Sequence, residues 1–349
     1  MSALQIWRMR YLIYIVNCRV RKIVVPYSLR GRGDACHYTT YVREAVRSAI
    51  SVETIYRAAI VLFFVVSFGF SFARANAAVQ SVAVSGSNSA LALAQTDPSA
   101  LVRNASQNEL ANSYGHRLPM RYRLRKITAK SDTTKEIVET RDGAVARLIA
   151  VDGHALGPAR AQQEAQRLHS VSSDPAIEAH RRSSERRDAQ RINEIMRLLP
   201  DAFIYRYAGK IDTPDGSAIH LTFGPNPKFS PPDLTTRVLT GIRGDIWIDA
   251  DDLRVVRIDG HIFKTVDYGW GLLGTVNPGG TVLLERTKTS ECGWQLTRLS
   301  IHLHGRALLF KTLHISIEET ATDYHRVSSS WTYQDAVRWL LGVFPKLAQ

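Results

Sequence analysis

Apolar and polar residues alternate with a period of two through most of the second half of the chain, and short turns rich in glycine, proline and aspartate separate the runs. Successive side chains of a strand point to opposite faces, so this pattern predicts half-buried antiparallel strands. We expect them at 203–209, 218–223, 241–249, 253–264, 281–288, 293–304 and 307–319. Gly305 and Arg306 are predicted to form the turn between the last two.

The same alternation begins earlier, at residue 120, and predicts further strands at 135–140 and 144–152. Asp97 followed by Pro98 is typical of a helix start and predicts a helix to about residue 112. A helical insert is expected over 158–199, with a break near 172–175, and a last short helix over 333–341.

The second part of the insert, 176–197, carries charged residues on nearly every side, and only Ile192, Ile195, Met196 and Leu199 form an apolar stripe. A helix packs through its apolar stripe, so only the C-terminal end is expected to pack on the core. Interleaved acidic and basic residues are more typical of a solvated helix than of a site for an acidic partner or anionic lipid.

Antiparallel strands with two helical regions predict an α+β fold. We expect one large curved antiparallel sheet, an incomplete barrel, with helices packed on its concave face. A single domain over 97–349 would form it. Residues 78–96, rich in small and polar side chains, are expected to be a flexible leader.

An apolar run at 58–73, which contains Ser67, Gly69 and Ser71, follows Arg57 and precedes the small-residue triplet 75–77. This order is typical of a secretory signal peptide, and the run is short for a bilayer span. We therefore interpret 1–77 as an N-terminal extension plus signal, cleaved near 77/78, and expect export to the periplasm or cell envelope. The alternative is an uncleaved anchor at 58–75.

Removal of that segment changes the charge and cysteine content. Residues 1–77 contribute +8 of the total +13, so the remainder carries only +5, which argues against a nucleic-acid partner. Cys292 would be the one cysteine left, so an internal disulfide is excluded for the processed chain.

Residues 244–249 (Gly-Asp-Ile-Trp-Ile-Asp), followed by 253–260, resemble the strand–turn–strand signature of periplasmic outer-membrane lipoprotein-sorting (Lol) carriers. Segments 267–271 and 307–311 are more similar to uncharacterised secreted relatives of that family. The resemblance implies an incomplete barrel around helices, with an apolar cavity for acyl chains of lipids or lipoproteins and no cofactor.

Inward-facing apolar residues of the predicted strands are the candidates for the lining of such a cavity. They are Trp247, Val256, Ile258, Ile262, Leu283, Leu299, Ile301, Leu309, Leu313 and Ile315. For any one of them, ordinary core packing is the simpler interpretation.

His302, His304 and His314 are the weak candidates for a metal site, because residues two apart share one face of a strand. No nucleophile elbow, zinc-protease motif, phosphate loop or dinucleotide motif is present in a fitting context. The sequence therefore favours a non-catalytic binding protein for a lipid, an acyl chain or a lipoprotein. The alternatives are a sensor module that binds an envelope protein and, with less support, a histidine-dependent metallo-hydrolase.

Overall fold

The computed structural model describes residues 86–114, 119–269, 271–307 and 311–343. The predicted extension and signal (1–77, with its apolar run at 58–73) and the anchor alternative (58–75) lie outside these residues. Within the described ranges, no helix has both the length and the apolar character needed to cross a bilayer.

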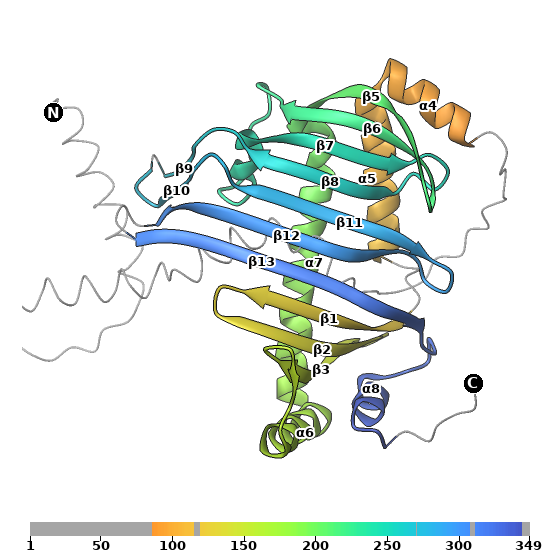
Figure 1. Cartoon of the computed structure of the whole chain (residues 1–349), viewed down its shortest axis with the longest axis vertical. Helices are drawn as coiled ribbons and strands as arrows, with labels where there is room; N and C mark the ends of the chain where they lie inside the picture. Colours follow the sequence, from red (N-terminus) through yellow and green to blue (C-terminus); the bar gives the residue numbers. More distant parts are fainter. Residues whose placement is uncertain (1–85, 115–118, 270, 308–310, 344–349) are drawn as a thin grey trace, which may run out of the picture. The chain divides into compact units, whose positions relative to one another are not determined.

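Thirteen strands form one antiparallel sheet, and eleven of them make an unbroken path that does not close into a barrel (Figure 1). The path runs β4-β3-β2-β1-β13-β12-β11-β8-β7-β6-β5; off this path, β10 pairs with β12, and β9 pairs with β10. The strands are β1 (Met120–Thr128), β2 (Ser131–Thr140), β3 (Gly143–Val151), β4 (His154–Ala155), β5 (Phe203–Thr213), β6 (Gly216–Pro225), β7 (Ile242–Asp249), β8 (Val255–Ile262), β9 (Val266–Tyr268), β10 (Gly274–Val276), β11 (Thr281–Thr289), β12 (Gly293–Ala307) and β13 (Lys311–Arg326).

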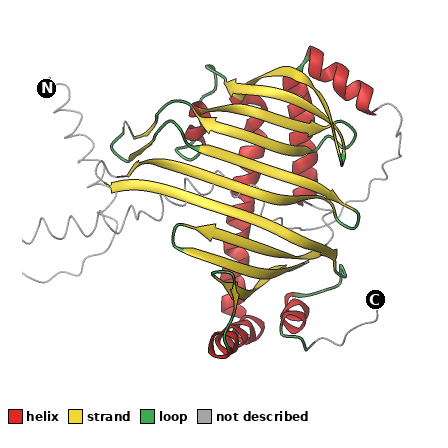
Figure 2. Cartoon of the chain, in the orientation of Figure 1, coloured by secondary structure: helices red, strands yellow, loops and turns green. Residues whose placement is uncertain are grey.

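Helices α5 and α7 pack on one face of this sheet, here named the inner face; the opposite face is named the outer face (Figure 2). The short helix α8 packs on the outer face, against Val138 and Val145 of the β2–β3 hairpin. The helical segments are α4 (Gly86–Thr96), α5 (Pro98–Tyr114), α6 (Pro158–Ser173), α7 (Pro175–Ala202), the 3₁₀ turn η1 (Thr236–Gly241) and α8 (Tyr333–Leu340).

The first described strand pairs with the last. β1 lies antiparallel to β13, with Leu124 opposite Ala321 and Lys126 opposite Glu319. The Lys126 Nζ lies 2.7 Å from an oxygen of the buried Glu319 carboxylate, which fixes the register with a charge-assisted hydrogen bond. The hairpins before and after the helical insert are thereby joined into one sheet.

The predicted α+β class and the open antiparallel sheet are confirmed. Two local expectations are wrong. Residues 86–96 form α4 rather than a flexible leader, because Ala90 and Ala94 are buried against the core that contains β5 and β6. Gly305 and Arg306 continue β12 and pair with β13 and β10, so they do not form a turn.

The N-terminal half of α7 is held by a polar network, which also corrects the expectation that only the C-terminal end packs. The Arg181 guanidinium donates to Glu178 (2.6 Å), to Glu185 (2.5 Å) and to the backbone carbonyls of Ala144 (2.5 Å) and Asp142 (3.1 Å). It thus ties the helix to the turn between β2 and β3.

The two edges of the sheet differ in whether other elements hydrogen bond to their backbone groups. Along β3, side chains of α6 satisfy the free edge: the Leu148 N–H donates to Glu164 (2.8 Å), and Arg167 donates to the Ala146 carbonyl (2.6 Å). Along β5, no described group other than β6 hydrogen bonds to the backbone, and Ile204 and Ile211 are exposed. An uncovered edge strand presents unpaired N–H and C=O groups.

Candidate functional site: an apolar pocket between α7 and the sheet

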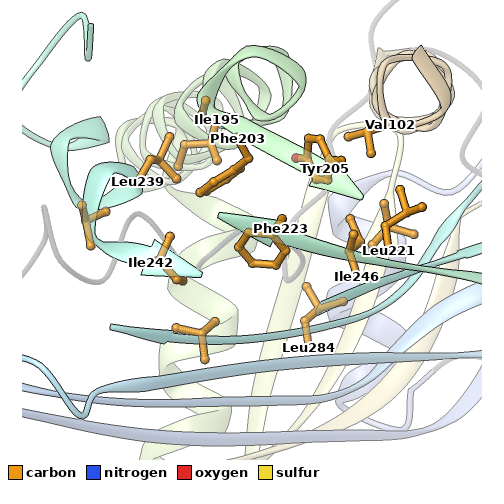
Figure 3. Packing of buried hydrophobic residues seen from close by; sticks show 14 of the residues in the cluster. Val102, Ile195, Phe203, Tyr205, Leu221, Phe223, Leu239, Ile242, Ile246 and Leu284 are labelled. Atoms are coloured by element: carbon orange, nitrogen blue, oxygen red, sulfur yellow. The ribbon is translucent and has the colours of Figure 1, made fainter. Parts of the chain in front are cut away.

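A pocket of about 70 Å³ lies on the inner face, between the C-terminal half of α7 and the strands from β5 to β12. Its eleven lining side chains are all apolar: Ile195, Met196, Leu199, Phe203, Phe223, Leu239, Ile242, Ile258, Val282, Leu284 and Leu299. Figure 3 shows six of them converging from α7, η1 and the strands.

Periodicity explains why these residues meet. Ile195 and Leu199 are four apart on α7, so they lie one above the other on the face that meets the sheet. Val282 and Leu284 are two apart on β11 and share the inner face. The register then places Leu284 between Ile258 of β8 and Leu299 of β12.

The end of α7 forms one wall of the pocket. Pro200 lies inside the helix, and because proline lacks an N–H it cannot bond to the carbonyl four residues earlier. The buried Tyr205 hydroxyl donates to the Leu199 carbonyl at 2.9 Å and anchors this last turn. Met196 faces the pocket with three rotatable bonds, which suits it to irregular contents.

Two phenylalanines form the wall at the β5 side. The rings of Phe203 and Phe223 have centroids 4.8 Å apart at an interplanar angle of 59°. Tilted pairs of this kind are favourable and leave the ring surfaces free to contact a hydrocarbon.

Three charged side chains form a separate cluster on the α5 side of the inner face. Glu109 of α5 accepts two hydrogen bonds from Arg254 (both 2.9 Å) and one from Arg286 (2.6 Å). Burial alone would raise the pKa of Glu109, but the two guanidiniums outweigh it and lower the pKa to about 2. The carboxylate therefore stays ionised and paired, and clamps α5 onto β11 and the start of β8.

The pocket can hold hydrocarbon but offers no acid, base or nucleophile. A space of this size has room for water, but water enters only where two or more polar partners are available. Left empty, an apolar cavity of about 70 Å³ costs about 2 kcal/mol of stability at the usual cost per unit volume. An apolar occupant would recover that free energy.

Of the residues predicted to line a cavity, Ile258 and Leu299 line this pocket. Ile262, Ile301, Leu313 and Ile315 are buried in the same core without lining it, and Leu309 lies outside the described residues. Val256 is buried at the β7–β8 bulge and does not line it either.

Trp247 and Leu283 lie on the outer face. The Trp247 indole stacks on the His220 imidazole, with centroids 4.6 Å apart and planes at 4°, and the Arg257 guanidinium lies 5.2 Å from its centroid. Leu283 pairs with Asp259 and Ser300, two outer-face residues. Neither side chain reaches the pocket.

Sequence reasoning missed several lining residues. The missed residues on β5, β6, η1 and β7 are Phe203, Phe223, Leu239 and Ile242. On β11 they are Val282 and Leu284, the two neighbours of the predicted Leu283. The apolar stripe on α7 was recognised as core-forming, but nothing in the sequence showed that it faces these strands.

The three histidine candidates share the outer face, as their spacing predicted. His304 lies directly opposite His314, and His302 lies opposite Ser316 and 2.7 Å from a Glu318 oxygen. Across the described ranges, however, no three histidine, cysteine, aspartate or glutamate side chains are grouped closely enough to hold a metal ion.

Compared with protein-family models, with curated proteins and with solved structures, the chain matches none significantly. The resemblance to lipoprotein-sorting carriers therefore stays a prediction, and a functional proposal has to depend on the geometry of the pocket.

Proposed function

We propose that this protein binds the apolar tail of an amphiphile, such as a fatty acid, a lipid or the acyl chain of a lipoprotein, in the pocket between α7 and the sheet, without catalysis. The observation that carries this proposal is the uniformly apolar lining, built from a helix, a 3₁₀ turn and six strands. A hydrocarbon tail is the chemistry that such a lining favours, since each buried methylene contributes about 0.8 kcal/mol.

Size limits how the tail is held. The roughly 70 Å³ observed is well below the several hundred Å³ of typical ligand sites. The pocket as it stands takes the terminal methylenes, and a longer tail requires Met196 and Leu199 to move outward with the last turn of α7. Affinity should then rise about fourfold per added methylene until the widened pocket is full.

A pair of neighbouring substitutions on β11 tests this proposal. Val282→Phe fills the pocket, and Leu283→Phe adds the same ring to the outer face of the same strand. We expect saturated fatty acids of increasing length to displace an environment-sensitive fluorescent fatty acid from the wild type and from Leu283→Phe. Val282→Phe should lose at least tenfold in affinity while its thermal midpoint is kept.

Equal binding by Val282→Phe and wild type would refute the pocket as the site. Failure of the wild type to take up any chain in the series would refute the function.

A second candidate function is recognition of an extended segment of another protein, favoured by the uncovered edge of β5. A peptide added to that edge would complete the free hydrogen bonds of the strand. Hydrogen exchange distinguishes the two functions: a peptide partner would protect amides of β5, and a tail in the pocket would protect the last turns of α7.

A further inference from the structure

Positive charge on the outer face is neutralised over the middle of the sheet but not at one end. In the middle, Arg257 lies 2.8 Å from Glu285 and 3.1 Å from Asp259. At the end formed by the start of β7 and the ends of β8 and β12, Arg243, Lys264 and Arg306 are exposed, and no described carboxylate forms an ion pair with any of them. We name the surface formed by these three residues the basic patch.

Histidines extend the basic patch across three strands. Arg243 donates to the His261 imidazole at 2.9 Å, and the row continues through Thr281 to His302. The directly opposed pair of His304 and His314 lies in the next row. All four imidazoles are exposed, and those of His261 and His302 are already hydrogen bonded, to Arg243 and to Glu318.

Apolar side chains lie at the same end of the sheet. Phe263 is half-buried, with the Arg243 guanidinium 5.0 Å and the Lys264 ammonium 5.7 Å from its ring centroid. Leu272, in the turn between β9 and β10, is 37% exposed. Apolar side chains between lysines and arginines are typical of surfaces that lie at a bilayer interface.

We propose that the basic patch docks the protein on an anionic lipid bilayer. Phosphate headgroups supply the missing counter-charges, and Phe263 and Leu272 meet the acyl boundary. A nucleic acid would use aromatic rings for base stacking, whereas the Phe263 ring already carries cations against it. The patch and the pocket share β7, β8 and β12 but lie on opposite faces, so docking does not depend on the proposed pocket function.

Sedimentation of the full chain with vesicles tests the docking. The measured quantity is the excess bound to vesicles of phosphatidylcholine and phosphatidylglycerol in equal parts over that bound to phosphatidylcholine alone. This difference cancels any charge-independent insertion by residues 58–73. We expect Arg243→Gln, Lys264→Gln and Arg306→Gln each to lower the partition coefficient about fivefold, and the triple variant to lower it on the order of a hundredfold.

The matched control removes the same charge from the other side of the sheet. Arg186→Gln, Arg187→Gln and Arg191→Gln on α7 are likewise exposed and should leave the excess unchanged. A lysine-and-arginine exchange that keeps charge (Arg243→Lys, Lys264→Arg, Arg306→Lys) should retain binding, which separates loss of charge from loss of fold.

Three outcomes would overturn the proposal: no excess for the wild type, equal losses in patch and control variants, or binding to an acidic polypeptide but not to the anionic vesicles. The fatty-acid displacement assay in solution reports on the pocket separately, so the two proposals can fail independently.

Discussion

Along its C-terminal half, α7 contacts the inner face through Ile195, Met196 and Leu199 and leaves a pocket. Along its N-terminal half, the same helix is held by Arg181, whose donors all point at named acceptors on α7 and on the turn between β2 and β3. Apolar contacts have no direction, so they tolerate an unfilled gap, whereas a hydrogen-bonded ion network is stable only in one geometry.

Two carboxyl groups, Glu109 beside α5 and Glu185 in the polar region, have opposite pKa shifts. On the pocket side, Arg286 and Arg254 lower the pKa of Glu109. In the polar region, burial raises the pKa of Glu185 to about 8 despite Arg181, and its Oε2 has no hydrogen-bond partner within the described residues. Glu109 has two guanidinium partners, and so does Glu178, whose pKa is also lowered by Arg181 and Arg182 despite burial; Glu185 has Arg181 alone, which does not outweigh desolvation.

Removal of Arg181 should have the largest effect. Arg181→Ala leaves Glu185 without its cation and Glu178 with Arg182 alone, and breaking a buried ion pair from one side costs about 4 kcal/mol. Urea unfolding measures the loss. Arg187→Ala, on the exposed side of the same helix, should change the unfolding free energy by less than about 0.5 kcal/mol. Equal losses in both variants would show that the network does not hold the helix.

Acid should weaken the pocket region through Glu109. Its folded-state pKa is about 2 against a reference of 4.5, so its stabilisation is complete above 4.5 and is lost as the pH falls towards 2. The shift corresponds to about 3 kcal/mol. Unfolding free energies measured from pH 5 to pH 2 should show this loss, and Glu109→Gln should flatten that part of the profile. An unchanged slope in Glu109→Gln would contradict the assignment.

Ile195→Ala should distinguish the two regions, because a bound fatty acid should restore the stability that this variant loses. Truncation of this buried residue costs about 2 to 3 kcal/mol and enlarges the pocket, so a saturating fatty acid should raise the thermal midpoint of Ile195→Ala more than that of the wild type. Ile177→Ala, which truncates an exposed isoleucine of α7, is the control and should show no extra gain. Rescue of Arg181→Ala by the same ligand would erase the distinction between the halves.

Glu185 should give an effect that is visible only at high pH. Because its folded-state pKa is raised, its contribution is complete below 4.5 and is lost as the pH rises through about 8. Glu185→Gln should therefore keep its thermal midpoint between pH 6 and pH 9 while the wild type declines. Glu194→Gln, on the exposed side of α7, should decline with the wild type.

The secondary structure was largely predictable because its signals are local. The strand alternation, the break before Pro175 and the start of α8 were read correctly, and Thr332 does cap α8 in a reciprocal bond with Asp335. The pairing of β1 with β13 was not predictable, because it joins segments almost two hundred residues apart by register alone.

The pocket was predictable only in part, for reasons seen in two strands. Residues 282–284 are Val-Leu-Leu, so apolar side chains occupy both faces of β11 and the alternation that would assign a face is missing. Trp247 was predicted to face inward because tryptophan is large and apolar, but its ring lies on the outer face, where His220 and Arg257 cover it. Neither contact leaves a sequence signal.

The unequal edges of the sheet set a limit on self-association. On the β3 side, Glu164 and Arg167 occupy one amide and one carbonyl of the edge, whereas no described group covers the edge of β5. Two molecules that meet through β5 about a two-fold axis would each use up the more accessible edge. Concentrated preparations of this protein should therefore form pairs through β5 more readily than longer assemblies.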